Sequence, residues 1–134
     1  MRTSAKNPLT AHRESILRVV ERSRAPITAE LVHRALKNVD LATVYRALYF
    51  LAQTRRITEF VVDCSEEGIV RYYYPLREPH LHFFHCTSCH RFIPYDGCSV
   101  SDSLSKFERE SGCAVRTHAL SLSGLCAACN TGDA

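Results

Sequence analysis

The sequence is poor in long apolar runs. No stretch of about 18 apolar residues occurs, the minimum for a candidate membrane-spanning helix. The first residues, from Met1 to Leu9, are polar and lack the apolar segment of a secretory signal. Internal repeats and low-complexity tracts are also missing. These absences predict a chain with neither a membrane span nor a secretory signal, and we expect a cytoplasmic protein.

The chain is short for two self-sufficient domains. It has 134 residues, and its 46% hydrophobic content predicts a folded protein. Two domains of about 65 residues would each have a marginal core, which metal binding or dimerisation commonly supplements. Seven cysteines in a compartment that keeps thiols reduced favour metal binding over disulfides.

Charge is unevenly distributed along the chain. Residues 1–60 carry eleven Lys and Arg against five Asp and Glu, whereas residues 61–134 carry six against nine. A basic first half and an acidic second half predict a polyanionic partner, such as nucleic acid, for the first half alone. The alternative is that the mild basicity only solvates a surface.

Three helices and a hairpin are expected in a first domain, residues 1–76. Apolar residues at helical spacing predict helices over 10–24, 28–37 and 41–54, capped by Thr10, Thr28 and Asp40. β-Branched and aromatic runs then flank a Gly-containing turn, which predicts a β-hairpin of residues 57–63 and 69–74. This order is typical of a winged helix-turn-helix.

A hinge at residues 77–79 and a second domain at 80–134 are expected to follow. Strands are predicted at 82–86, 91–95 and 115–122, and a helix over 100–111 with Leu104 and Phe107 facing inward. The predicted fold class is therefore α+β, an N-terminal winged helix-turn-helix followed by a small α/β domain.

Two CxxC pairs have the spacing of a metal site: Cys86 with Cys89, and Cys126 with Cys129. Two intervening residues let both thiolates of a pair reach one ion, and two pairs complete a closed tetrahedral shell. Four thiolates favour zinc or an iron–sulfur cluster. Because a closed shell leaves no position for a substrate, we expect a structural zinc ion. The alternative is four buried or free thiols.

Three histidines could hold a second ion. His80 and His82 are two residues apart, so their imidazoles share one face of a strand, and His118 is expected on the last strand. Asp102, in the first turn of the predicted helix, could add a carboxylate. Such a set suits zinc and also iron, nickel or manganese. The alternative is that these histidines are structural or surface residues.

The remaining cysteines and two histidines lie near these sites. Cys64, Cys98 and Cys113 are expected to be small buried hydrophobic residues, and the alternative is that one of them senses oxidation. His85 and His90 flank the first CxxC pair and are expected to order its loop or to support its ligands.

Together these motifs resemble the ferric uptake regulator family over nearly the whole chain. They read L-T-x-x-R at residues 9–13, L-A-T-V-Y-R-A-L at 41–48, H-x-H-x-x-x-C-x-x-C at 80–89, and H-x-L-x-x-x-G-x-C-x-x-C at 118–129. The short chain and the H-x-H pattern look most like the zinc-sensing branch. The resemblance implies a homodimer held by a zinc-containing C-terminal dimerisation domain. It also implies a metal-loaded repressor of metal-homeostasis genes that binds palindromic operators in double-stranded DNA.

The resemblance assigns DNA contacts as well. The third predicted helix corresponds to the family's recognition helix, and Tyr45 and Arg46 match its major-groove pair. Arg can donate to guanine O6 and N7, and Tyr can pack on a thymine methyl group. Thr43 and Arg13 are expected at phosphates, and Lys6 at the backbone or minor groove. The alternative for Tyr45 is packing within its own domain.

The sequence departs from the family near the hinge, where members usually carry a sensing site. The positions of the usual ligands hold Tyr74 or Leu76, Leu81 and Phe83, none of which can ligate as needed. The family's second site matches the three histidines, but Ser101 replaces its usual Glu. We therefore expect any sensing to use a second divalent metal, expected to be zinc, at the histidine site.

Other readings stay open. The protein could bind DNA constitutively with purely structural zinc, or respond to oxidation through a cysteine. Three histidines with an open position also resemble a zinc hydrolase, but no general base or substrate pocket can be named. We therefore expect neither an enzyme nor a small-molecule substrate.

Overall fold

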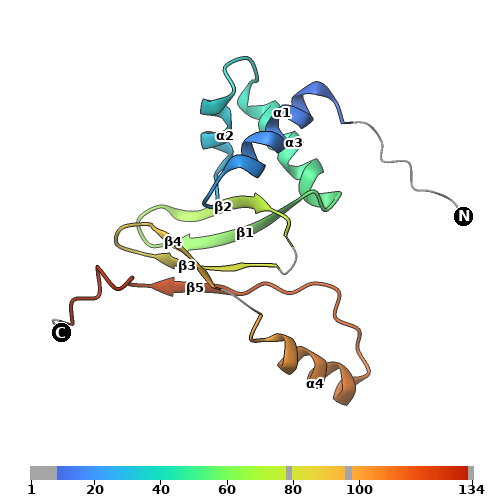
Figure 1. The fold of residues 1–134 in the computed structure, drawn as a ribbon, viewed down its shortest axis with the longest axis vertical. Coiled ribbons are helices and arrows are strands. Elements are labelled where there is room, and N and C mark those ends of the chain that lie inside the picture. The colour runs from blue at the N-terminus through green and yellow to red at the C-terminus, as the bar shows by residue number, and fades with distance from the viewer. Residues whose placement is uncertain (1–8, 78–79, 96–97, 133–134) are drawn as a thin grey trace, which may run out of the picture. The chain divides into compact units, whose positions relative to one another are not determined.

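The structure, a computed structural model, describes residues 9–77, 80–95 and 98–132. Figure 1 shows the elements in chain order: α1 (Ala11–Arg22), α2 (Ala29–Ala35), α3 (Leu41–Gln53), β1 (Ile57–Cys64), β2 (Gly68–Pro75), β3 (His82–Cys86), β4 (Phe92–Tyr95), α4 (Ser101–Ser111) and β5 (Ser121–Gly124). No helix in these ranges is long and apolar enough to cross a membrane.

The chain divides into two compact units. The first contains the residues up to Glu59 together with Arg71–Leu76, and the second contains Phe60–Val70 together with the residues from Arg77 onward. The outer half of the β1–β2 hairpin therefore groups with the C-terminal residues. The domain boundaries at 76 and 80 stay a prediction, and the expected hinge includes residues 78 and 79, which lie outside the described residues.

Side-chain caps begin the three helices of the first unit, as predicted. Thr10, Thr28 and Asp40 each accept a hydrogen bond from the backbone N–H three residues further on. These caps satisfy donors that the first turn of a helix leaves unpaired. The bond to Asp40 is the shortest at 2.7 Å, so the start of α3 is well defined.

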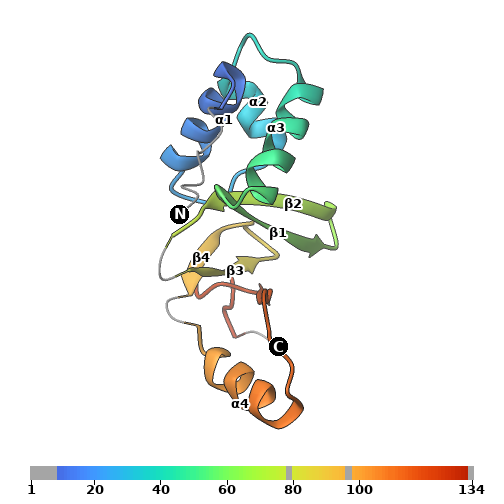
Figure 2. The same ribbon diagram turned by 90° about the vertical axis from the view of Figure 1, so that its right-hand side faces the viewer.

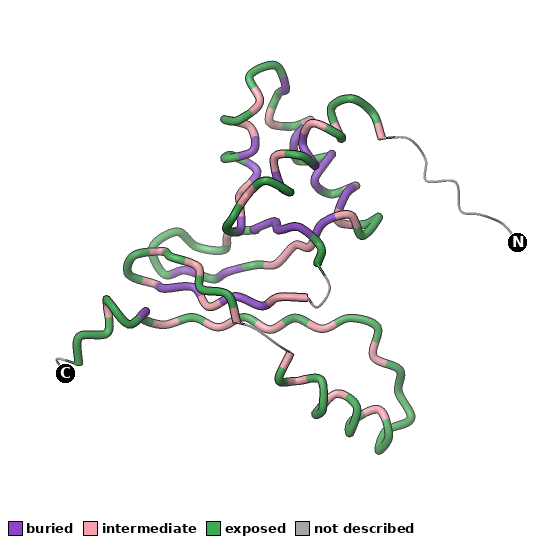
Figure 3. Tube along the Cα trace, in the orientation of Figure 1, coloured by how far each residue is buried: buried purple, intermediate pink, exposed green. Residues whose placement is uncertain are grey.

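The apolar faces of α1, α2 and α3 form the core of the first unit, and Figure 2 shows these three helices packed together. Figure 3 colours the buried stretches of the backbone purple. The fully buried aliphatic side chains of these helices are Ile16, Val20, Val32, Val44, Leu48 and Leu51. Burial of each contributes about 1.5–3 kcal/mol. Because the core fixes one face of α3, the opposite face is left exposed.

A three-stranded sheet organises the second unit. Its order is β4-β3-β5, with β3 antiparallel to β4 and parallel to β5. The register places Cys86, at the end of β3, opposite Gly124, at the end of β5. Because parallel strands end at the same edge of a sheet, the turns that follow β3 and β5 meet there. This topology brings together the two CxxC pairs, which 36 intervening residues separate in the sequence.

The structure corrects two sequence-based expectations in this unit. β5 begins only at Ser121, so His118 precedes the last strand instead of lying on it. α4 forms almost as predicted and ends at Gly112, whose φ of 74° suits a left-handed cap. However, Leu104 and Phe107 do not face a core: none of the helix residues is buried, and Phe107 is 51% exposed. The helix is amphipathic, and its apolar face is only partly covered, because Leu104 is half-buried and Phe107 is exposed.

Candidate metal centres and nucleic-acid interface

The four cysteines of the CxxC pairs form one cluster. Their sulfur atoms all lie within 4.8 Å of one another, and the Sγ atoms of Cys89 and Cys126 are 3.7 Å apart. A tetrahedral zinc ion with Zn–S bonds of about 2.3 Å separates its sulfurs by about 3.8 Å. The backbone N–H groups of Cys126 and Cys89 also point at the Cys86 sulfur, at 3.3 and 3.5 Å. The cluster has the dimensions of a structural zinc site.

The electrostatics of this cluster favour a bound cation. The backbone N–H groups of Cys126 and Cys89 lower the pKa of Cys86 to about 5, which stabilises its thiolate. A hydrogen bond from Ser88 lowers the pKa of Cys129, but the Cys126 and Cys86 thiols outweigh it and raise this pKa to about 11. The backbone N–H of Cys129 also lowers the pKa of Cys126. The cluster therefore favours thiolates at Cys86 and Cys126 but opposes one at Cys129, and a divalent cation would offset that repulsion.

The three histidines converge through the same ring nitrogen. His118 Nε2 lies 3.1 Å from His80 Nε2 and 3.3 Å from His82 Nε2. Zinc–nitrogen bonds of about 2.0–2.1 Å at tetrahedral angles imply nitrogen separations of about 3.3–3.4 Å. Burial lowers the pKa of His82, and the neighbouring His80 and His118 lower it further. The neutral imidazole, the form that binds metal, is thus favoured.

A cysteine joins this histidine cluster. Cys98 Sγ lies 3.2 Å from His118 Nε2, and the four ligand atoms lie within 4.8 Å of one another. Asp102, on the first turn of α4, is not a member of this group. The expectation that Cys98 is a buried hydrophobic residue is wrong, because its sulfur faces an imidazole. Cys113 is exposed, so the same expectation is wrong there, whereas Cys64 is buried as predicted.

The exposed face of α3 carries the expected DNA-contacting pair. Tyr45 is 44% exposed, and Arg46 is exposed beside it. The Tyr45 hydroxyl donates a hydrogen bond to the Glu30 carboxylate on α2. This bond raises the pKa of Tyr45 and lowers that of Glu30. Tyr45 is therefore tethered at its tip while its ring stays on the surface.

Basic and polar side chains surround a depression next to this pair. Arg13, Thr43 and Arg46 line it together, and its volume is about 480 Å³. Arg46 Nη2 donates to Thr43 Oγ1 at 3.3 Å, and the Arg13 guanidinium lies over the Phe50 ring at 3.6 Å. The structure thus brings together four of the five residues expected at DNA. The fifth, Lys6, lies outside the described residues.

Comparison with known proteins identifies the family. The profile of the ferric uptake regulator family matches residues 5–123. The chain belongs to this family. The ferric uptake regulation protein of Bacillus subtilis strain 168 is 31% identical over 136 residues, covering 95% of this chain and 88% of that protein. The Helicobacter pylori ferric uptake regulator structure, described as having three functional metal binding sites, matches with a TM-score of 0.71 at 20% identity, over 95% and 85% of the two chains.

A zinc uptake regulator complexed with zinc and DNA matches as well, with a TM-score of 0.60 and 27% identity over 91% of this chain and 83% of that one. The predicted family and the predicted fold class are confirmed. As a member of the ferric uptake regulator family, the protein is a metal-responsive, DNA-binding transcriptional regulator and not an enzyme.

Sequence reasoning missed two participants in these sites. Cys98 belongs to no spacing motif, and the chain between it and His82 turns back through β4, so only the fold brings it to the histidines. Glu30, the partner of Tyr45, is 15 residues away on another helix. Glu30 lies on the same surface because α2 packs against α3. No local feature of the sequence indicates this position.

Proposed function

We propose that this regulator is a zinc-responsive repressor that binds a palindromic operator in double-stranded DNA as a homodimer in the cytoplasm. The four-cysteine cluster holds a structural zinc ion. The cluster of His80, His82, His118 and Cys98 holds the second, regulatory zinc ion, and the exposed face of α3 reads the major groove.

The observation that carries this proposal is the convergence of three Nε2 atoms and one sulfur. His118 Nε2 lies 3.1–3.3 Å from the other three atoms, and all four lie within 4.8 Å of one another, close enough to share one small ion. A thiolate among imidazoles favours zinc over manganese, which prefers oxygen ligands. With Ser101 at the position of the family's usual Glu and Cys98 beside the histidines, the preference of this site shifts towards a softer metal.

The residues near the hinge support the same assignment. By the family resemblance, Tyr74 or Leu76, Leu81 and Phe83 stand at the positions of the usual sensing ligands, and none of these side chains is a ligand of the usual kind. With that site lacking its ligands, the response to metal falls to the histidine–cysteine cluster. The similarity to a zinc uptake regulator complexed with zinc and DNA is consistent with zinc as the metal.

The mechanism is a shift between two populations. Metal at the histidine–cysteine cluster favours the arrangement of the dimer that binds both halves of the operator. The ion can shift this equilibrium only by the difference in its affinity for the two arrangements. DNA binding must tighten zinc binding by the same factor, because the coupling is reciprocal.

The test is operator binding by fluorescence anisotropy at a fixed salt concentration, with the four-cysteine zinc retained. Zinc, iron(II), manganese and nickel are titrated separately. We expect zinc to tighten binding by about tenfold or more, equivalent to about 1.4 kcal/mol of coupling. His118→Ala should abolish that response. Cys98→Ser should weaken the response to zinc more than the response to manganese.

Two results would contradict the proposal. Tight binding that no metal alters would identify a constitutive DNA-binding protein with purely structural zinc. Binding that peroxide abolishes, and that Cys98→Ser protects in the absence of added metal, would identify an oxidation-responsive regulator. The second outcome has a physical basis, because Cys98 is only partly buried and its sulfur is therefore accessible to an oxidant.

A further inference from the structure

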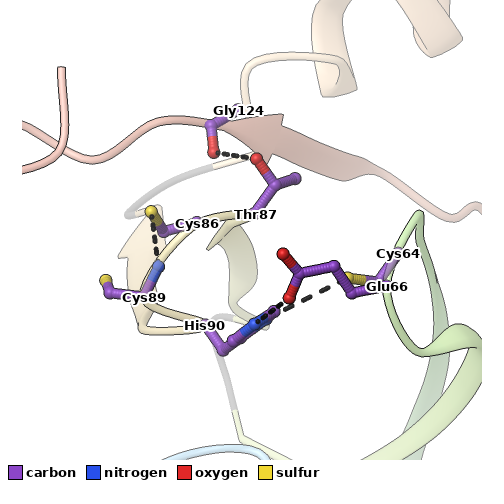
Figure 4. A network of polar contacts seen from close by, with 7 residues as sticks. All are labelled: Cys64, Glu66, Cys86, Thr87, Cys89, His90 and Gly124. Atoms are coloured by element: carbon purple, nitrogen blue, oxygen red, sulfur yellow. Dashed lines mark hydrogen bonds and ion pairs between the residues drawn. The ribbon is translucent and has the colours of Figure 1, made fainter.

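A third group of metal-ligating side chains lies apart from the two centres described above. Cys64, Glu67 and His90 place their ligand atoms within 4.8 Å of one another. Cys64 is the last residue of β1, Glu67 lies in the turn before β2, and His90 follows the first CxxC turn. All three belong to the second compact unit. Figure 4 shows His90 reaching from the cysteine loop towards the hairpin.

The two ring nitrogens of His90 have different partners. Nδ1 faces the Cys64 sulfur at 4.0 Å, and Nε2 lies 3.2 Å from a carboxylate oxygen of Glu66. A carboxylate that accepts the Nε2–H bond fixes the tautomer in which Nδ1 offers its lone pair. A histidine that binds a metal almost always donates its other N–H in this way. The orientation of His90 is therefore that of a metal ligand with its supporting carboxylate.

The distances and burial fit a small divalent ion. Tetrahedral zinc with one sulfur and one nitrogen ligand separates these atoms by about 3.6 Å, close to the 4.0 Å between Cys64 Sγ and His90 Nδ1. Cys64 is buried, whereas Glu67 is exposed. The site is thus closed on its thiol side and open to water on its carboxylate side.

The backbone of the loop holds His90 in place. Its φ of 62° is left-handed, and its N–H donates to the Cys86 carbonyl oxygen at 2.9 Å. His90 is consequently anchored by the same turn that carries the four-cysteine cluster. An ion bound at His90 would sit on a preformed loop and would not have to order a free one.

An unpartnered buried imidazole lies next to this group. His85 is 1% exposed, and within the described part of the chain neither of its ring nitrogens has a hydrogen-bond partner. Its ring centroid is 5.5 Å from that of His90. Buried polar groups without a partner are rare, and a bound ion or an ordered water is a common partner for such a group. His85 therefore lies beside His90 as a buried polar neighbour of the group, although it is not itself one of the grouped ligands.

We propose that Cys64 Sγ, His90 Nδ1 and the Glu67 carboxylate bind one zinc-type divalent cation, with water as the remaining ligand and Glu66 supporting His90. On binding, the Cys64 thiol releases its proton to solvent. The ion links the outer part of the β1–β2 hairpin to the loop that follows β3. The chain then holds three metal ions, two of them with a single thiolate ligand.

Cobalt(II) is the probe, because a bound thiolate gives it a near-ultraviolet charge-transfer band. The full-length protein keeps zinc in its four-cysteine cluster and carries Cys98→Ser, so that the histidine cluster offers no thiolate. We expect cobalt(II) still to produce a one-thiolate band. Cys64→Ser should remove this band, and Glu67→Gln should weaken cobalt binding by roughly tenfold or more. Cys113→Ser, which changes an exposed cysteine outside all three groups, is the matched control and should keep the band.

The design separates loss of the site from loss of the fold. Cys64 is buried, so each variant is checked for retained structural zinc and an unchanged circular dichroism spectrum. If Cys64→Ser unfolds, cobalt binding by Glu67→Gln and His90→Asn tests the site instead. Both variants should stay folded, because Glu67 is exposed and Asn tolerates the left-handed conformation of residue 90. The proposal is overturned if the Cys98→Ser protein shows no thiolate band with cobalt(II). It is also overturned if the folded site variants bind cobalt(II) with unchanged affinity and keep the band. Cys64 and His90 would then be a hydrogen-bonded pair without metal. DNA binding plays no part in this readout, so failure here is distinguishable from failure of the zinc-responsive repressor.

Discussion

Removal of the Arg46 side chain should discriminate between reading of bases and attraction to phosphate. Arg46 is exposed, and its guanidinium is held by Thr43, so Arg46→Ala should leave the free energy of unfolding within about 0.5 kcal/mol. One bidentate Arg–guanine contact contributes about 1–3 kcal/mol of discrimination. A homodimer makes two such contacts, so operator affinity should fall by about 2–6 kcal/mol. This corresponds to a factor of at least about 25 in Kd.

The assay is anisotropy with an operator and a scrambled duplex over a range of salt concentrations. Arg46→Ala should weaken operator binding far more than binding to scrambled DNA. Arg46→Lys should keep the non-specific affinity but lose the discrimination, because Lys lacks the planar fork. The control is Arg109→Ala, which removes the same charge from α4. Base reading would be refuted if Arg46→Ala lost equal affinity for both duplexes and the slope of log affinity against log salt concentration fell by about 0.9 per contact. Arg46 would then contact phosphate.

Three further predictions concern stability. Leu48→Ala removes a fully buried side chain and should lower the free energy of unfolding by about 2–5 kcal/mol in urea titrations; a loss below about 1 kcal/mol would show that the core collapses around the gap. Cys126→Ser should release the structural zinc and unfold the second unit, seen as lost zinc content with the circular dichroism of the first unit retained; a variant that keeps full zinc would exclude Cys126 as a ligand. Asp40→Ala should destabilise α3, whereas Asp40→Asn should preserve the cap. The backbone N–H of Thr43 lowers the pKa of Asp40, so this stabilisation is present above the ordinary pKa of the carboxyl group and disappears as the pH falls through the lowered value. Thermal unfolding at a series of pH values measures how the stability difference between wild type and Asp40→Ala depends on pH. A difference that grows as the pH falls would contradict this prediction.

The local features of the fold could be predicted from the sequence because their causes are local. Caps, apolar spacing and a Gly-containing turn placed α1 to α3 and the hairpin within a few residues. The spacing of the CxxC pairs was enough to predict that the four cysteines cluster. Each of these signals acts over a few residues, so no knowledge of the tertiary structure was needed.

The features that the sequence did not predict depend on tertiary packing. His118 was expected on a strand, but β5 pairs with β3 only from Ser121 onward. His118 therefore lies in the irregular segment that precedes β5. Cys98 and His90 gain their roles from neighbours 20 and 26 residues away. From the sequence, Asp102 was the expected additional ligand, and Cys98 was not expected at this site. In the structure Cys98, and not Asp102, belongs to the group with the three histidines.

The exposed apolar face of α4 gives the last prediction, which concerns the dimer. Leu104 and Phe107 lie three residues apart on one face of the helix, and Phe107 is 51% exposed. Full burial of a Phe side chain contributes about 1.5–3 kcal/mol, so covering the exposed half contributes about 0.8–1.5 kcal/mol. A twofold axis doubles this to about 1.5–3 kcal/mol. Phe107→Ser should therefore raise the dimer dissociation constant by about 10- to 150-fold.

Sedimentation equilibrium measures this constant, and Lys106→Ser is the control, since Lys106 is exposed on the adjacent, charged face of α4. If the two variants dimerise equally well, the interface lies elsewhere and α4 is simply a solvated helix. If only Phe107→Ser weakens the dimer, operator binding by this variant should be lost steeply as the protein is diluted, even though α3 is unchanged. A single recognition helix offers one Arg46, and only the dimer combines two such contacts into operator-level affinity. The apolar face of α4 would then control DNA binding through the assembly, without touching the DNA.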